Sequence, residues 1–120
     1  MTQISSDVIR GYTDTMILFL LLENPSYGYE LSKQIRELTS EKYIIKETTL
    51  YSAFSRMQKN GYIEAFSYEA DESRKRRTYY RITEAGKNYY QEKCREWTLT
   101  KEVVEHFIKY SDLAEQEDTR

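Results

Sequence analysis

The spacing of apolar residues changes from helical to strand-like and back again, and this order constrains the fold more than any other feature. Three successive stretches have helical spacing, over residues 7–22, 27–39 and 48–59. Two shorter runs rich in aromatic and β-branched residues then follow, over residues 62–68 and 78–83. Helical spacing returns at Glu84 and continues to about Tyr110, a length of roughly 40 Å at the rise of an α-helix. We therefore expect a mostly α fold with a two-stranded β-hairpin, a winged helix-turn-helix followed by a long C-terminal helix.

Capping and turn residues mark the ends of these elements. Pro25 ends the first helix, and Ser26 can cap the second. Gly61 tolerates the left-handed backbone that follows a helix, so the third helix ends there. Thr83 can cap the last helix. The polar, charged residues 69–77 are expected to form the tip of the hairpin.

Composition excludes several classes of protein. The one cysteine, Cys94, cannot form a disulfide within the chain, which fits a reducing compartment. The longest apolar run, residues 16–22, is too short to cross a bilayer, and the first residues do not resemble a signal peptide. We therefore expect a cytoplasmic protein with no membrane partner.

Catalytic and metal-binding patterns are missing from the sequence. His106 and Cys94 stand twelve positions apart and form no metal-ligand cluster with other residues. Four glycines in 120 residues leave no glycine-rich phosphate loop, and the carboxylates form no recognisable pair. We expect neither an enzyme nor a cofactor, and no metal site.

Charge is distributed unevenly along the chain. Residues 46–87 carry nine basic and six acidic side chains, a net charge of +3, although the whole chain has a net charge of −2. A basic centre in an acidic protein favours a polyanionic partner, but a solvated charged face explains the same numbers equally well.

Four short segments carry a resemblance to a known family. They are residues 27–31 (YGYEL), 49–51 (TLY), 60–63 (NGYI) and 76–86 (RRTYYRITEAG). In this order and at this spacing they resemble segments of the PadR-like transcriptional regulators. The resemblance extends from about Arg10 to Tyr110, and residues 76–86 are its most specific part.

The resemblance implies a transcription regulator that binds double-stranded DNA as a homodimer. Trp97, alone in the middle of the last helix, makes the chain most similar to the compact, multidrug-responsive members, in which a tryptophan near this place lines a chamber between the subunits. The chain also departs from the family. Ser52 replaces a common proline, and Lys46 replaces a capping residue, so that Thr48 is left to cap the third helix. Thr100 and Lys101 stand where chamber-forming members tend to carry an acid.

The resemblance and the element order together divide the chain. Residues 1–83 are expected to form the winged helix-turn-helix DNA-binding domain with its N-terminal helix. Residues 84–110 are expected to form the dimerisation helix, and the acidic residues 111–120 to fray.

The third helix is the candidate recognition helix, because hydroxyl and cationic side chains lie opposite its apolar face. Such groups donate to base edges and phosphates, whereas a solvated helix face is the alternative. The candidate DNA-binding residues of this helix are Thr48, Thr49, Tyr51, Ser52, Ser55, Arg56 and Lys59.

The hairpin supplies further candidate DNA contacts. Arg74, Lys75, Arg76 and Arg77 form a run of four cations, which suits contact with phosphates, although a charged turn that prevents aggregation is the alternative. Tyr27 begins the second helix, where it either donates to a phosphate or packs against the hairpin.

The last helix has an apolar stripe that the rest of a small chain cannot cover. A second copy is the simplest cover, although a hairpin folded back within one chain is the alternative. The candidate dimer contacts are Trp97, Val104, Phe107 and Ile108.

A small apolar or aromatic effector is expected beside this stripe. Trp97 either stacks on such a ligand or only anchors the dimer. If Lys101 faces the chamber, it favours neutral or anionic compounds. The candidate effector-binding residues are Val8, Tyr12, Thr15, Cys94, Trp97 and Lys101.

The leading interpretation is a ligand-responsive repressor that binds a palindromic operator as a homodimer. A winged-helix module that binds another protein is the first alternative, and neutral or acidic electrostatics around the third helix would favour it. An RNA-binding winged domain is the second alternative, marked by aromatic side chains on a flat strand face. The alternating sequence of the hairpin predicts no clear platform of that kind.

Overall fold

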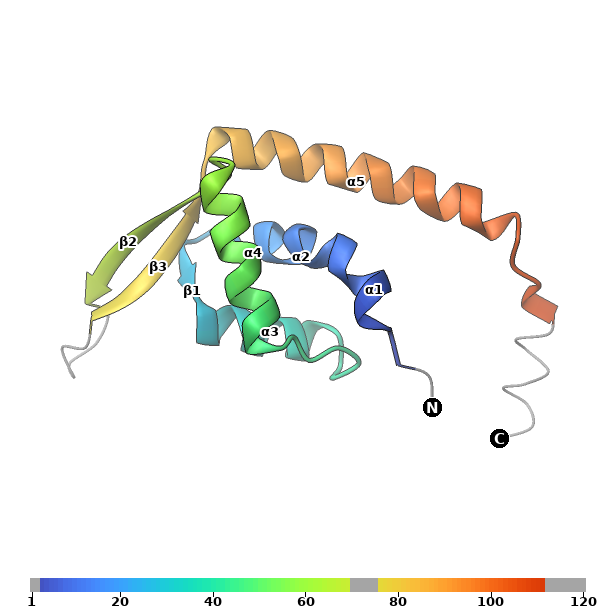
Figure 1. Cartoon of the computed structure of the whole chain (residues 1–120), viewed down its shortest axis with the longest axis horizontal. Coiled ribbons are helices and arrows are strands. Elements are labelled where there is room, and N and C mark those ends of the chain that lie inside the picture. The colour runs from blue at the N-terminus through green and yellow to red at the C-terminus, as the bar shows by residue number, and fades with distance from the viewer. Residues whose placement is uncertain (1–2, 70–75, 112–120) are drawn as a thin grey trace.

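The computed structural model describes residues 3–69 and 76–111 of the chain. Figure 1 shows one long helix running beside a smaller bundle, with two strands projecting at one end. The elements are α1 (Ser6–Ile9), the 3₁₀ turn η1 (Arg10–Tyr12), α2 (Thr13–Leu21), β1 (Ser26–Tyr27), α3 (Gly28–Leu38), α4 (Glu47–Lys59), β2 (Ile63–Glu69), β3 (Arg76–Ile82) and α5 (Glu84–Glu105). The mostly α, winged helix-turn-helix fold is confirmed.

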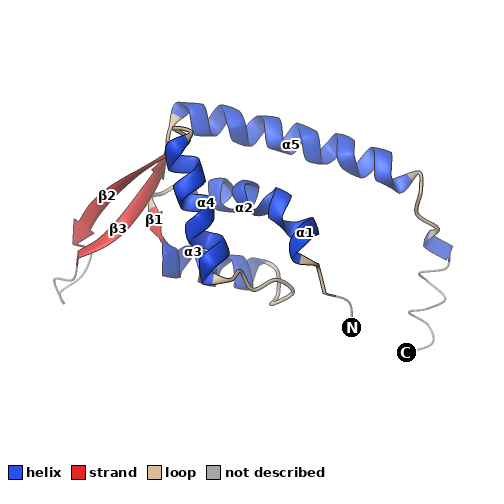
Figure 2. Cartoon of the chain, in the orientation of Figure 1, coloured by secondary structure: helices blue, strands red, loops and turns tan. Residues whose placement is uncertain are grey.

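The sheet has one more strand than the sequence predicted. Within the described residues the strand order is β1-β3-β2, and both pairings are antiparallel. Ser26 pairs with Tyr80 and Tyr27 with Tyr79, so Ser26 belongs to a strand and does not cap α3. A two-residue strand has no periodicity of its own, and only its partner β3 defines it. Figure 2 shows this short strand beside the two longer ones.

Several predicted boundaries were wrong. The first helix is interrupted by η1, where the chain tightens around Gly11. Thr48 lies inside α4, which begins after Lys46 without a side-chain cap. Arg76 and Arg77 lie in β3 instead of the hairpin tip, because their backbones pair with β2.

The predicted end of the last helix also needs correction, and some predicted features lie outside the described residues. The long helix stops at Glu105 and a turn follows, so it is shorter than the predicted 84–110. Arg74 and Lys75, and residues 112–120 of the predicted frayed tail, lie outside the described residues.

The core fixes α4 against α2, α3 and the sheet. Phe54 and Met57 of α4 are fully buried, together with Leu18 of α2 and Leu31 of α3. The ring of Phe54 stacks on Tyr80 of β3 at a centroid distance of 4.0 Å. Aromatic stacking adds to the burial of apolar area, so the sheet and α4 are held as one unit.

The first turn of α5 is anchored to the turn that follows α4. The Thr83 hydroxyl accepts from the Gly86 amide at 3.0 Å and donates to the Gly61 carbonyl at 2.7 Å, which confirms Thr83 as the cap. Gly86 is the buried residue of this helix. Beyond the first turns, α5 runs past α2 and away from the sheet (Figure 1).

Replacing Gly86 by alanine should destabilise the fold strongly. An added Cβ would lie 2.1 Å from the backbone oxygen of Tyr62 and 2.8 Å from Cγ1 of Ile82. A backbone oxygen cannot rotate away, so we expect the free energy of unfolding to fall by about 3 kcal/mol, measured by urea denaturation. Gly11→Ala is the control, since nothing lies within 4 Å of its added Cβ. Equal stability of the two variants would contradict the anchoring of α5.

Candidate DNA interface and ligand cavity

One face of α4 is free of the core and carries hydroxyl and cationic groups. The helix buries Leu50, Ala53, Phe54 and Met57, and this periodicity turns the opposite face outward. Thr49 is half-buried there. The exposed predicted contacts are Thr48, Tyr51, Ser52, Ser55, Arg56 and Lys59. The structure therefore brings the seven predicted helix residues onto one accessible surface.

Tyr51 is partly held by contacts within the protein. Its ring lies edge-on to Phe54 at 5.4 Å, and a Cβ added to Gly28 would lie 2.5 Å from its hydroxyl oxygen. Gly28 thus leaves room for Tyr51 at the start of α3. The side chain remains 46% exposed, so its outer edge is accessible from solvent.

Arg56 has an internal partner that sequence analysis did not identify. Its guanidinium donates to Oδ1 of Asp14 in α2, a residue that is 7% exposed. The two residues lie 42 positions apart, and no local pattern relates them. Part of the Arg56 side chain is therefore engaged inside the protein, and the rest is accessible at the edge of the α4 surface.

Tyr27 packs against the hairpin, the second of the two roles that the sequence left open. Its ring lies 5.1 Å from Tyr79, and the guanidinium of Arg77 lies over it at 4.8 Å. Arg76 is exposed on the same strand. Stacking on Tyr27 places the Arg77 guanidinium close to the start of α3.

Aromatic side chains gather on one face of the sheet, contrary to the expectation of no platform. Phe66 pairs with Tyr79 and Tyr68 lies edge-on to Tyr79 at 5.0 Å, while Arg81 lies over Phe66 at 4.7 Å. Alternation along the strands brings these side chains to the side opposite the buried Tyr80. The rings contact one another, and Arg81 covers Phe66 as Arg77 covers Tyr27. Tyr68 remains 49% exposed at the edge of this face.

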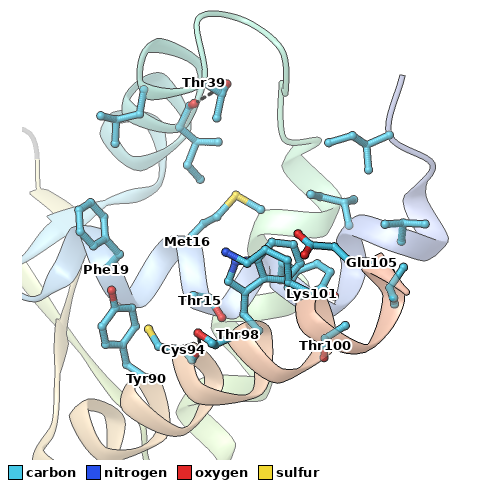
Figure 3. A pocket seen from close by; sticks show the side chains of 18 of the residues that line it. Thr15, Met16, Phe19, Thr39, Tyr90, Cys94, Thr98, Thr100, Lys101 and Glu105 are labelled. Carbon is cyan, nitrogen blue, oxygen red and sulfur yellow. Dashed lines mark hydrogen bonds between the residues drawn. The ribbon is translucent and has the colours of Figure 1, made fainter. Parts of the chain in front are cut away.

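A cavity of about 1120 Å³ lies between the N-terminal helices and α5 (Figure 3). All of the predicted effector-binding residues line it, namely Val8, Tyr12, Thr15, Cys94, Trp97 and Lys101. Helical spacing placed these residues on the facing sides of two helices, and the fold brings those sides together. Trp97 lies edge-on to Tyr12 at a centroid distance of 5.1 Å, so it bridges the two walls.

The cavity wall is mainly apolar and aromatic, with polar groups at separate points. Phe19 and Tyr90 lie across from each other at 6.5 Å (Figure 3). Burial raises the pKa of the Tyr90 hydroxyl above its ordinary value, and its hydrogen bond to Cys94 raises the pKa further. Lys101 and Glu105 both line the cavity, one helical turn apart. The sequence analysis missed Glu105, which offsets the preference for anions expected from Lys101 alone.

The family model described as the transcriptional regulator PadR-like family matches residues 17–92. The chain belongs to the PadR-like family of transcriptional regulators. Regulators of this family bind DNA and are not enzymes.

Solved and curated relatives of this PadR-like regulator cover most of its length. The structure of a transcriptional regulator from Clostridium thermocellum is 62% identical, with a TM-score of 0.80 over 87% of this chain and 100% of that one. A PadR family regulator from Clostridium difficile R20291 is 35% identical, with a TM-score of 0.70 over 82% and 99%. An uncharacterized protein from Lysinibacillus sphaericus is 43% identical over 106 residues, or 88% and 96% of the two chains.

The apolar residues at the end of α5 and in the turn after it are incompletely covered by the regulator's own chain. Val104 lies in α5, whereas the predicted dimer contacts Phe107 and Ile108 follow its last residue, Glu105. Val104 is 48% exposed, Phe107 83% and Ile108 40%, and Trp97 is also exposed. Val104 and Ile108 line the cavity, whereas Phe107 does not. Apolar side chains exposed together along one stripe mark a surface that binds another molecule.

The part of the regulator that the structure describes has neither a membrane-spanning helix nor a metal-binding cluster. In residues 3–69 and 76–111, no helix is long and apolar enough to cross a membrane. The same residues contain no group of three or more histidine, cysteine or acidic side chains arranged to hold a metal ion.

Proposed function

We propose that this PadR-like regulator is a ligand-responsive repressor that binds a palindromic operator as a homodimer. The observation that carries the proposal is the outward face of α4, where six of the seven predicted DNA contacts are exposed. Glu47, at its first turn, is the one acidic residue of this helix, whereas Arg56 and Lys59 are basic. A face rich in donors and poor in acids suits the major groove, and the exposed Arg76 of β3 suits the neighbouring phosphates.

Homodimer formation is proposed from the exposed apolar residues at the end of α5 and in the turn after it. A second copy related by two-fold symmetry would cover Val104, Phe107 and Ile108, and would close the open side of the cavity. Two subunits would also present two copies of α4, which is what a palindromic operator requires. Sequence-specific binding would then depend on the distance between the two copies of α4.

The cavity is the proposed effector site, because its wall suits a planar, largely apolar compound. Tyr12, Phe19, Tyr90 and Trp97 supply aromatic surfaces on which such a ligand can stack. A ligand that prefers one spacing of α5 and α2 would favour one arrangement of the dimer. DNA affinity would then change by the coupling free energy between the two sites.

A gel-shift experiment tests the proposal as a whole. The protein is titrated into a duplex from the region upstream of its own gene, with and without hydroxycinnamic acid and anilinonaphthalene sulfonate. We expect a discrete complex that either compound weakens. If no complex forms with this duplex or with random duplexes, the winged-helix module that binds another protein becomes the better interpretation. A complex that both compounds leave unchanged would remove the effector part of the proposal.

Replacing Trp97 by alanine should weaken dye binding by roughly tenfold, since an aromatic stack is worth about 0.5–1.5 kcal/mol beyond the apolar area that it buries. Binding is followed through the fluorescence of anilinonaphthalene sulfonate, because the variant lacks the protein's one tryptophan. Trp97→Phe is the control and should retain most of the affinity. Unchanged dye affinity together with a weaker dimer would assign Trp97 to the subunit interface instead.

A further inference from the structure

We propose that Asp14 is a positioning residue that ties the recognition helix α4 to both walls of the ligand cavity, through Arg56 and Tyr89. This inference rests on the proposed DNA-binding function of α4. It assigns a role to the buried carboxylate, which neither the DNA-binding face nor the cavity includes. It also implies that DNA binding and ligand binding in the cavity are coupled through these three side chains, so that each changes the affinity of the other.

The Asp14 carboxylate receives donors from two different helices. Arg56 of α4 donates to Oδ1, and the Tyr89 hydroxyl of α5 donates to Oδ2 at 3.3 Å. Asp14 belongs to α2 and is 7% exposed. A buried carboxylate is costly without partners, so loss of either donor changes the environment of the other. The contact joins three helices at one point.

The two helices that hold Asp14 and Tyr89 also form the cavity walls. Thr15 follows Asp14 directly and lines the cavity, and Tyr90 follows Tyr89 and does the same. Adjacent residues on each helix thus point to the carboxylate and to the cavity. A ligand that changes the separation of α2 and α5 must therefore change the bond between Tyr89 and Asp14.

The other end of the contact reaches the DNA-facing side of α4. Arg56 lies with Thr13, Thr49 and Ser52 around a small hollow of about 200 Å³. Its side chain is 46% exposed, so the ion pair lies at the border between core and surface. Movement of Asp14 would shift α4 through Arg56, at the helix face that carries Ser52.

A second contact runs from Tyr89 to the turn after α4. The ring of Tyr89 stacks on Tyr62 at 4.1 Å with an interplanar angle of 9°, and Nζ of Lys93 lies 5.5 Å from the centre of the same ring. The stack holds the ring independently of its hydroxyl. Tyr89→Phe therefore removes the bond to Asp14 and keeps the stack, which makes it the sharpest variant for a test.

Trp97 emission on DNA binding provides the readout, because coupling between two sites is reciprocal. Trp97 is the one tryptophan and lies in the cavity wall, so its emission reports the cavity when DNA binds elsewhere. The full-length protein is titrated with the upstream duplex, and both DNA affinity and the change in emission at saturation are measured. We expect DNA to change the emission of the parent protein.

Tyr89→Phe should reduce the emission change by at least about half while DNA affinity stays within about threefold of the parent. Asp14→Asn should reduce it too and should also lower DNA affinity, because the ion pair with Arg56 is lost. Tyr62→Phe is the control, since it keeps the stack and the Tyr89 hydroxyl, and it should respond like the parent. Thermal unfolding of each variant identifies any that lose stability.

The outcomes separate the two proposals. If the parent binds the duplex and Tyr89→Phe shows an undiminished emission change, the positioning role is overturned and DNA binding stands. A parent that binds DNA without any change at Trp97 overturns it as well. A lower melting temperature of Tyr89→Phe with a normal emission change would mean that the contact is only structural. If the parent binds no DNA, the proposed function itself fails.

Discussion

Replacing Val104 and Phe107 together by glutamate should convert the regulator to a monomer and lower its operator affinity by at least about 100-fold. Both side chains are exposed in the isolated chain, at 48% and 83%, so the substitutions remove little from its own core. In the proposed dimer they would place four unpaired charges at an apolar interface, at a cost of several kcal/mol each. Sedimentation velocity gives the mass, and fluorescence anisotropy gives the operator affinity.

The matched control replaces Val104 and Phe107 by leucine, which keeps the stripe apolar. We expect this control to remain dimeric at micromolar concentration and to bind the operator within a few-fold of the parent. A glutamate variant that still sediments as a dimer would place the subunit interface away from the end of α5 and the turn after it. A parent that sediments as a monomer would remove the reason to expect a palindromic operator.

Replacing Arg76 and Arg77 together by alanine should weaken binding to operator and random DNA by the same factor. Each phosphate contact that is lost removes about 0.9 from the slope of log affinity against log salt. Two such contacts correspond to a loss on the order of 50-fold at about 0.1 M salt. Anisotropy titrations over a range of salt concentrations give both the slope and the affinity.

Arg81→Ala is the control for the wing variant. Arg81 lies on the same strand but pairs with Glu64 at 3.1 Å and covers the Phe66 ring. We expect its loss to leave the salt slope nearly unchanged. An unchanged slope in the double variant would mean that Arg76 and Arg77 do not contact phosphate. A loss confined to operator DNA would instead indicate that these arginines read bases.

Most of the fold could be predicted from the sequence, because apolar residues recur at different intervals in helices and in strands. The facing sides of the N-terminal helices and of α5 followed directly from spacing, which is why the predicted effector residues converge on one cavity. The strand β1 could not be predicted, since two residues have no period and pair only when β3 lies beside them. The interruption at Gly11 was missed because a 3₁₀ turn keeps nearly helical spacing.

The parts of the site that were missed depend on contacts between distant residues. Asp14 looks like an ordinary charged residue in a helix, and only the fold brings Arg56 and Tyr89 to it. Glu105 could have been found, because it follows Lys101 by one helical turn and must share its face. The packing of Tyr27 under Arg77 required the register of β1 against β3.

The affinity ratio between the upstream duplex and a scrambled duplex of equal length tests the central claim most directly. It is measured by anisotropy at fixed salt for the parent protein and for Ser52→Ala, whose side chain is exposed on α4. We predict that the parent prefers the upstream duplex by at least about 1000-fold. Ser52→Ala should reduce that preference by about 5–150-fold, as loss of a base contact worth roughly 1–3 kcal/mol requires, with little change on scrambled DNA. Equal affinity of the parent for the two duplexes would contradict the reading of DNA by α4.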